Sequence, residues 1–241
     1  MATALIFAGG TGSRMNSKSK PKQFLNLFGK PVIIHTLEHF EYSEEIDSIA
    51  VVCRESWIGY LKEQLKHHYF EKVRWVVSGG ETGQQSIYNG LKAIYESCDN
   101  PEETIVLIHD GVRPLINDKL ISDNIAAVKQ FGSAITVTKV VETVIHTNDN
   151  NEIVDIPSRK YAKIAKAPQS FYLSDIMAAH EKAISDNLSN MIDSASLMMH
   201  YGHKLHTVDG PVENIKITTP SDYYIFRAIY EARENSQIFG L

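Results

Sequence analysis

The 241-residue chain has the composition of an ordinary globular protein, with 43% hydrophobic and 22% charged residues. Its formal net charge of −5 argues against non-specific binding to nucleic acid or to an anionic membrane. No apolar run is long enough for a membrane-spanning helix, and Gly9 and Gly10 interrupt the first one too early for a signal peptide. We therefore expect a cytoplasmic protein, with Cys53 and Cys98 as reduced thiols because they form no C-x-x-C pair.

Apolar strands alternate with longer helical patterns over residues 1–138. The predicted strands are 3–7, 46–53, 73–77, 104–108 and 134–138. The predicted helices between them are 32–40, 57–69, 84–96 and 120–131. This alternation predicts an α/β fold, a Rossmann-like, doubly wound and mostly parallel sheet covered by helices on both faces.

The pattern changes at residue 139. Residues 139–165 are strand-like but broken and polar, which predicts a β-arm that protrudes from a single domain spanning 1–241; a surface β-meander is the alternative. The remaining sequence predicts helices at 174–185 and 193–201, strands at 204–209 and 214–217, and a last helix from 221 to about 234 with Ser221 as its N-cap.

The first predicted strand runs into a glycine-rich loop in a region without carboxylates. Residues 1–37 contain no Asp or Glu, and the loop is Ala8-Gly9-Gly10-Thr11-Gly12-Ser13-Arg14. Small residues let backbone N–H groups approach a phosphate, although a tight strand–helix connection would use the same residues. The loop lacks the P-loop pattern, and Met15 stands where a dinucleotide fingerprint needs a third glycine.

Cations follow this loop. Arg14 can hold a phosphate with two parallel hydrogen bonds, and Lys22 can act as a point charge on a transferring phosphoryl group. Lys18 and Lys20 are interpreted as part of a solvated face. Together with the loop, Arg14 and Lys22 predict a polyphosphate site.

A second group of candidates follows the buried strand 104–108. Asp110 lies where a parallel sheet binds its ligands, and one carboxylate facing a phosphate loop suits Mg²⁺ held together with substrate phosphates. Arg113 places a cation three residues further on. An Asp at a strand end can also simply cap a turn, and His109 is interpreted as a packed residue outside the chemistry.

Three more segments carry weaker signals. Gly79 and Gly80 would let a base or sugar pack against the backbone, with Ser86 one helical turn further on, although a plain turn has the same pattern. Lys216 is flanked by apolar residues, so its charge needs an anionic partner. Arg159, at the end of the predicted arm, would on its own be a surface arginine.

Taken together, these segments resemble the cytidylyltransferases that activate a sugar or polyol phosphate with CTP. The methylerythritol phosphate and ribitol 5-phosphate enzymes are two branches of that family. The resemblance extends from Leu5 to Asp222. Its markers, in order, are residues 8–15, Pro21-Lys22-Gln23, Gly79-Gly80, Ser86, His109-Asp110-Gly111-Val112-Arg113-Pro114, Pro168-Gln169 and Asn214-Ile215-Lys216.

The resemblance implies roles for the candidate residues. Arg14, Lys22 and Lys216 are expected to be catalytic, and Asp110 is expected to hold Mg²⁺. Arg113, Thr143 and Arg159 match positions that bind the acceptor, with Arg159 acting across a homodimer interface formed by the arm. The expected nucleotide-binding residues are Ala8, Gly9, Gly10, Thr11, Gly12, Ser13, Gly80, Glu81 and Ser86.

Two departures bear on the branch. Thr82-Gly83 replaces the acidic–Arg pair that often follows the paired glycines, which affects base recognition. The run Glu142-Thr143-Val144-Ile145 lacks the lysine usual in the methylerythritol branch, whereas Ile156-Pro157-Ser158-Arg159 resembles the ribitol branch. Ribitol 5-phosphate is therefore the expected acceptor and methylerythritol phosphate the alternative. A nicotinamide oxidoreductase and a non-catalytic nucleotide-binding protein are more distant hypotheses.

Overall fold

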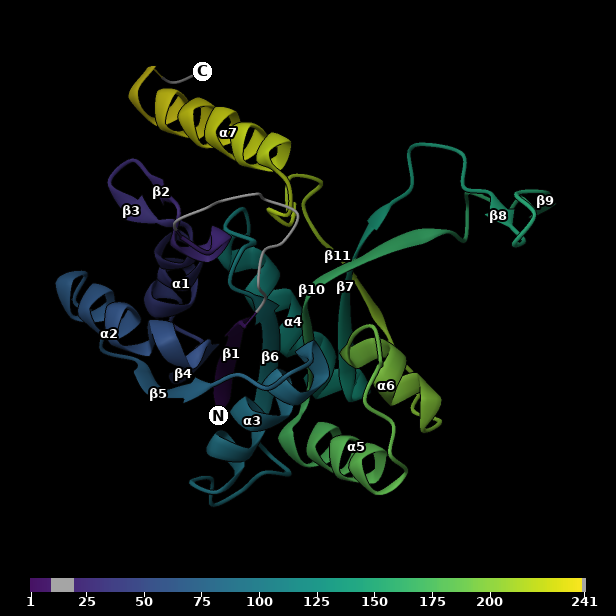
Figure 1. Cartoon of the computed structure of the whole chain (residues 1–241), viewed down its shortest axis with the longest axis horizontal. Helices are drawn as coiled ribbons and strands as arrows, with labels where there is room; N and C mark the ends of the chain where they lie inside the picture. Colours follow the sequence, from purple (N-terminus) through teal and green to yellow (C-terminus); the bar gives the residue numbers. More distant parts are fainter. Residues whose placement is uncertain (10–19, 240–241) are drawn as a thin grey trace.

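The computed structural model of the chain describes residues 1–9 and 20–239. Its centre is a seven-stranded sheet in the order β11-β7-β10-β6-β1-β4-β5 (Figure 1). The strands are β1 Ala2–Ala8, β4 Ser48–Cys53, β5 Val73–Ser78, β6 Ile105–Asp110, β7 Ser133–Lys139, β10 Lys163–Tyr172 and β11 Thr207–Asp209. Neighbouring strands are parallel except at β10, which is antiparallel to both β6 and β7. The predicted doubly wound, mostly parallel sheet is confirmed.

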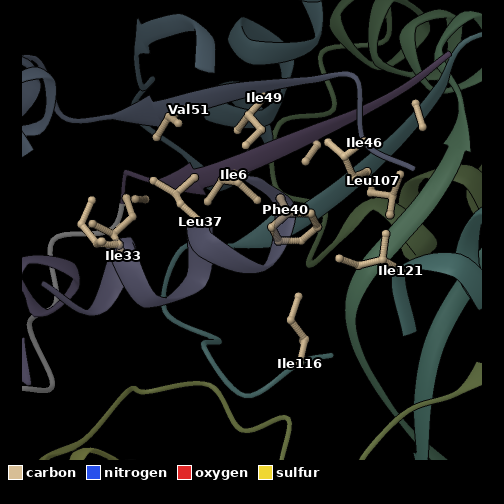
Figure 2. Packing of buried hydrophobic residues seen from close by; sticks show 14 of the residues in the cluster. Ile6, Ile33, Leu37, Phe40, Ile46, Ile49, Val51, Leu107, Ile116 and Ile121 are labelled. Carbon is tan, nitrogen blue, oxygen red and sulfur yellow. The ribbon is translucent and has the colours of Figure 1, made fainter. Parts of the chain in front are cut away.

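Helices cover both faces of the sheet because β1 alternates its side chains between two cores. Ala4 and Ile6 pack with α1 Val32–Tyr42, α2 Ile58–His67 and α4 Asp118–Phe131. Leu5 faces the other core, with α3 Gly83–Tyr95, α5 Leu173–Ser185 and α6 Ser194–His200. Figure 2 shows Ile6 beside Ile33 and Leu37 of α1. The central strands are thus buried on both faces, as parallel strands are.

A third, smaller core joins the segment that precedes α1 to the last helix of the chain. The 3₁₀ turn η2 Lys22–Phe24 leads into a short hairpin of β2 Asn26–Leu27 and β3 Lys30–Pro31. The last helix, α7 Pro220–Phe239, packs Phe226 against Leu27 and Val32 of this region. None of the helices in the described part of the chain is long and apolar enough to cross a membrane.

The segment between β7 and β10 projects from the sheet, to the right in Figure 1. It carries a separate two-stranded hairpin, β8 His146–Thr147 and β9 Ile153–Asp155. Exposed apolar side chains occur along it: Val141, Ile145, Ile153, Val154, Ile156 and Tyr161. The geometry agrees with the expected arm, while the division of the chain into one domain with an arm at 139–165 remains a prediction.

One predicted strand is wrong, one predicted helix begins at a different residue, and the sequence did not predict β10 or the β2–β3 hairpin. Residues 214–217 form no strand, because Ile217 N donates to Val112 O without a continuous ladder. The helix assigned an N-cap at Ser221 begins earlier: Thr219 accepts from Asp222 N, and the Asp222 carboxylate accepts from Thr219 N at 2.7 Å. This capping box, with Pro220 as the first helical residue, places Ser221 inside the helix. Of the elements that were not predicted, β10 is the one that lies in the middle of the seven-stranded sheet.

Candidate functional site

The candidate site lies at the carboxyl ends of β1 and β6. These strands are neighbours, with Phe7 opposite Asp110 in their register. Because β4 and β5 continue the sheet on one side of β1 and β6 lies on the other, a crevice is expected at this edge. The ends of both strands, Ala8 and Asp110, are buried there.

Asp110 is held between two cations. Its Oδ2 accepts from Arg113 Nε at 2.7 Å, and its Oδ1 lies 2.5 Å from Lys216 Nζ. The Lys216 ammonium also lies 5.9 Å from the centre of the Phe7 ring, which gives it a cation–π contact. Asp110 and Arg113, which were predicted as one group, therefore form one charged cluster with Lys216, which is distant in the sequence and was predicted separately.

The charge state of Asp110 follows from this cluster. Burial alone would raise the pKa of the carboxyl, but the nearby Lys216 and Arg113 charges outweigh it and lower the pKa to about 2. Asp110 is therefore a fully ionised carboxylate at neutral pH, ready to accept hydrogen bonds or to bind a cation.

Asn214 anchors the irregular segment that carries Lys216. Its side chain is fully buried, and Nδ2 donates to Ala167 O at 2.6 Å. Its own backbone carbonyl accepts from Arg113 Nη1 and from Lys166 Nζ, each at 3.0 Å. The segment 214–217 is thus held by β10 and by Arg113 instead of by a strand partner.

A cavity of about 340 Å³ opens beside this cluster. Asp110, Arg113, Lys166 and Lys216 line one end, and residues of α3, α5 and the start of α6 line the rest. Gln169 also lines the cavity and links β10 to the start of α6. Its Nε2 donates to Asp193 Oδ2 at 2.8 Å, and its Oε1 accepts from Ala195 N at 2.9 Å. The size and the mixture of apolar and charged walls fit a small anionic molecule.

Lys22 approaches the same edge from η2. The lysine is 9% exposed. Burial alone would raise the pKa of Asp222 at the start of α7, but hydrogen bonds from Thr219 and Thr218 and the charge of Lys22 together lower it. The neighbouring Gln23 donates from Nε2 to Ala8 O at 2.6 Å. This bond ties the Pro-Lys-Gln segment to the carboxyl end of β1.

The glycines that follow β1 and β5 lie against Ser86 of α3. A Cβ added at Gly9 or at Gly79 would come within 3.0 Å of Ser86 Oγ, so the two strand ends pack directly on that hydroxyl. Ser86 Oγ accepts from Gly80 N at 3.0 Å and donates to Thr82 O at 2.9 Å. Ser86 therefore shapes the glycine backbone in this structure.

Two groups of predicted residues do not join the Asp110 cluster, and a third cannot be placed relative to it. Glu81 is exposed and lines a different cavity, between α3 and α5. Thr143 and Arg159 contact each other on the projecting segment, with Arg159 Nη2 donating to Thr143 Oγ1 at 3.1 Å. Gly10, Thr11, Gly12, Ser13 and Arg14 lie outside the described residues.

His109, which was interpreted as a packed residue, is fully buried. Its Nε2 atom lies 3.1 Å from the Arg113 carbonyl oxygen, and burial lowers the pKa of the imidazole to about 4. The neutral ring is therefore a structural partner of the Arg113 turn.

Sequence reasoning missed two side chains. Lys166 follows Lys160 and Lys163 and stands between two alanines, so its sequence does not distinguish it, and only the β10 pairing places it at the cavity. Gln84 donates to Leu188 O at 2.8 Å and accepts from Met191 N at 3.0 Å, which positions the α5–α6 loop over the cavity. Gln84 comes shortly after Gly79-Gly80, and this closeness to the glycines was the only feature of the sequence that pointed to it.

Asp110 is also the residue of the cluster that could hold a metal ion. The described residues contain no group of three or more His, Cys, Asp or Glu side chains arranged for a metal. Mg²⁺ needs no such cage, because one carboxylate together with substrate phosphates is a usual donor set. A buried, ionised Asp110 at the wall of an anion-sized cavity fits that chemistry.

Comparisons with known proteins agree with this geometry. A protein named ribitol-5-phosphate cytidylyltransferase from Vibrio parahaemolyticus serotype O3:K6 is 53% identical over 240 residues, and one from Streptococcus agalactiae serotype III is 50% identical over 241; each alignment covers 100% of both chains. The crystal structure of 4-diphosphocytidyl-2C-methyl-D-erythritol synthase from Anaerococcus prevotii DSM 20548 matches with a TM-score of 0.82 at 31% identity, covering 95% of this chain and 96% of that one. The family model described as IspD, 2-C-methyl-D-erythritol 4-phosphate cytidylyltransferase, matches residues 2–232, and the chain belongs to this cytidylyltransferase family.

Proposed function

We propose that this protein transfers a cytidylyl group from CTP to D-ribitol 5-phosphate, giving CDP-ribitol and pyrophosphate. The observation that carries the proposal is the Asp110–Arg113–Lys216 cluster at the wall of the cavity. The full-length relatives at 50% and 53% identity are named for the ribitol acceptor, which supports this choice within the family. Because the chain belongs to the cytidylyltransferase family, this function takes the place of the nicotinamide oxidoreductase hypothesis.

In the reaction, an oxygen of the acceptor phosphate attacks the α-phosphorus of CTP. A phosphorus–oxygen bond forms, the bond between the α- and β-phosphates breaks, and pyrophosphate leaves with the electron pair. The protein forms no covalent intermediate, so catalysis consists of positioning the two substrates and stabilising charge on the five-coordinate phosphorus.

The cations supply that stabilisation. Lys22, on the rigid η2 turn beside Ala8, and Arg14 hold the triphosphate. Lys216 exchanges its contact with Asp110 for a phosphate oxygen as negative charge develops, because its side chain is 40% exposed and can move. Arg113 stays fixed by Asp110 and by the Asn214 carbonyl, and it holds the acceptor phosphate.

Mg²⁺ completes the nucleotide site in this proposal, with Asp110 as its protein ligand. The metal would supply positive charge that offsets the negative charge of the CTP phosphates. The backbone of residues 8–13 and of Gly80, together with Glu81 and Ser86, holds the cytidine and its phosphates. The packing of Gly9 and Gly79 on Ser86 supports a narrow nucleotide pocket at this place.

The acceptor site needs a second subunit. Thr143 and Arg159 contact each other on the segment between β7 and β10, which projects away from the sheet in Figure 1. A homodimer built through this arm, residues 139–165, would deliver the pair to the partner's cavity. The exposed apolar side chains along the segment support burial against another chain.

The test is an assay of pyrophosphate release by the purified protein with CTP and Mg²⁺. We expect release with ribitol 5-phosphate and little with 2-C-methyl-D-erythritol 4-phosphate. The reverse preference would refute the acceptor and leave cytidylyl transfer intact. Absence of release with either acceptor, in a protein shown to be folded, would refute the function itself.

A further inference from the structure

Lys166 occupies an irregular part of β10 beside the cavity. The pairing of β10 with β7 shifts register between Ala165 and Gln169, and such bulges re-aim side chains next to active sites. Ala165, Lys166 and Ala167 all line the cavity, together with Asp110 and Lys216. The irregularity therefore turns a lysine from a strand in the sheet toward the reacting groups.

The hydrogen-bond partner of Lys166 within the chain is a neutral carbonyl group. Lys166 Nζ donates to Asn214 O, the same atom that accepts from Arg113 Nη1. Within the part of the chain that the structure describes, no carboxylate lies at ion-pair distance from Lys166. One carbonyl oxygen shared between two cations compensates their charges only in part, and burial together with the Arg113 charge lowers the pKa of Lys166.

The charges on the cavity wall are unequal near this point. Arg113, Lys166 and Lys216 have one carboxylate on this part of the cavity wall, Asp110. The exposed Glu213 beside Asn214 adds a second negative charge outside the cavity wall, which opposes the lowering of the Lys166 pKa without forming an ion pair. The other acidic residue of the cavity, Asp193, is bound by Gln169 and by Ser196 N, at 2.8 Å each, at the start of α6. An anion placed beside Lys166 and Arg113 would balance the excess positive charge.

A purely structural role for Lys166 is the competing interpretation. The Asn214 segment already has two other anchors, the 2.6 Å bond to Ala167 O and the bond from Arg113. A lysine adds little to that anchoring, and even the partial burial of its charge is unfavourable without an anion beside it. The same side chain is well suited to a phosphate, as a mobile cation with three donors.

We propose that Lys166 binds the phosphate group of the polyol phosphate together with Arg113, as a further substrate-binding residue. The inference rests on the proposed function and deepens it, because it places the acceptor phosphate on the β10 side of Asp110. Phe7, Asp110 and the β10 residues line that cavity, whereas Gly9, Gly79 and Ser86 meet on the opposite, β5 side of β1.

The experiment compares Lys166→Met with Lys166→Arg. A charge-assisted hydrogen bond to phosphate predicts that Lys166→Met raises the KM for ribitol 5-phosphate by about 10- to 100-fold. The KM for CTP and the melting temperature should change little, and inorganic phosphate should become a correspondingly weaker competitor of the acceptor. Lys166→Arg should restore most of the acceptor affinity. Lys129→Met, which removes one positive charge near the opposite edge of the sheet, is the control for net charge.

Three other results for the variants would overturn the inference. An unchanged acceptor KM in a folded Lys166→Met protein would show that the ammonium does not touch the acceptor. Equal rises in both KM values with a lower melting temperature would show a structural role, and a rise for CTP alone would place the lysine at the nucleotide. If the wild type uses methylerythritol phosphate instead of ribitol 5-phosphate, the proposed acceptor fails. The same variants then test Lys166 with that phosphate.

Discussion

The Lys216 ammonium nitrogen lies 2.5 Å from Oδ1 of Asp110, although Asp110 ends a central strand and Lys216 belongs to an irregular segment that precedes α7. The contact joins the first half of the fold to its last segment. It also pairs the residue proposed to hold Mg²⁺ with a residue proposed to stabilise the reacting phosphate. Removing either partner should therefore change both chemistry and stability.

Asp110→Asn should lower turnover by several orders of magnitude, because it removes the proposed metal ligand while keeping the size of the side chain. It should also cost about 2–3 kcal/mol of unfolding free energy at neutral pH, since the lowered carboxylate pKa is worth that order of magnitude. Pyrophosphate release and urea unfolding measure the two effects. Asp123→Asn, which removes an exposed partner of Lys119, is the control. Near-normal turnover in Asp110→Asn would contradict the role of Asp110.

Lys216→Met should change the pH dependence of stability. The Asp110 pKa is about 2 in the folded protein and 3.8 in its reference state, so its stabilising contribution is complete above about pH 4 and is lost as the pH falls through 2. Without Lys216 the folded pKa rises and part of this contribution disappears at neutral pH. Unfolding curves at pH 7 and pH 3 should show a larger loss at pH 7. An equal loss at both values would show that the ion pair contributes nothing.

The sequence predicted most of the fold for a physical reason. Buried parallel strands such as β6 are short, continuous apolar runs, and the helices between them carry regular apolar faces. The sequence did not predict β10, because Pro168 cannot donate a hydrogen bond to a neighbouring strand and so argues against a central strand. The register shift between Ala165 and Gln169 accommodates it, and that irregularity cannot be inferred from composition.

The site was predictable in part for a similar reason. Asp110 and Arg113 follow a recognisable strand, so their place at the sheet edge could be inferred. Lys216 was correctly expected to need an anionic partner, but the strand assigned to it was wrong because the Asn214 carbonyl binds side chains. Lys166 carries no local signal, since its position depends on pairing with a strand that is distant in the sequence.

Lys22→Ala should lower turnover by about 100-fold or more, the usual cost of losing a group that stabilises charge in the transition state. The matched control is Lys20→Ala. Lys20 lies two residues away and places its ammonium 5.1 Å from the Tyr60 ring. The control should retain turnover within a few-fold, as measured by pyrophosphate release at saturating substrates. Equal losses in the two variants would indicate a general electrostatic effect instead of a specific role for Lys22.

Arg159→Ala and Lys22→Ala should complement each other if the arm acts on the partner subunit. Each variant alone should be nearly inactive. A mixed dimer would contain one site with both an intact Lys22 and an intact arm, so random mixing should restore roughly a quarter of wild-type activity. Co-expression followed by assay measures this recovery. Failure to recover activity, with mixed dimers demonstrated by two affinity tags, would contradict action in trans.

His180 should make the protein sensitive to mild acid. Burial lowers its pKa to about 4, and Nε2 has no hydrogen-bond partner within the described residues. A histidine normally titrates near 6.5, so its neutral form stabilises the fold fully above that value, and the contribution is lost as the pH falls toward 4. His180→Leu, which fills the same space without a titrating group, should reduce the loss of unfolding free energy between pH 7 and pH 5. Ala179→Ser on the same helix is a packing control, because it alters a neighbouring buried position and leaves the titration in place. An unchanged pH dependence in His180→Leu would mean that the imidazole gains protons equally well in the folded and unfolded chains.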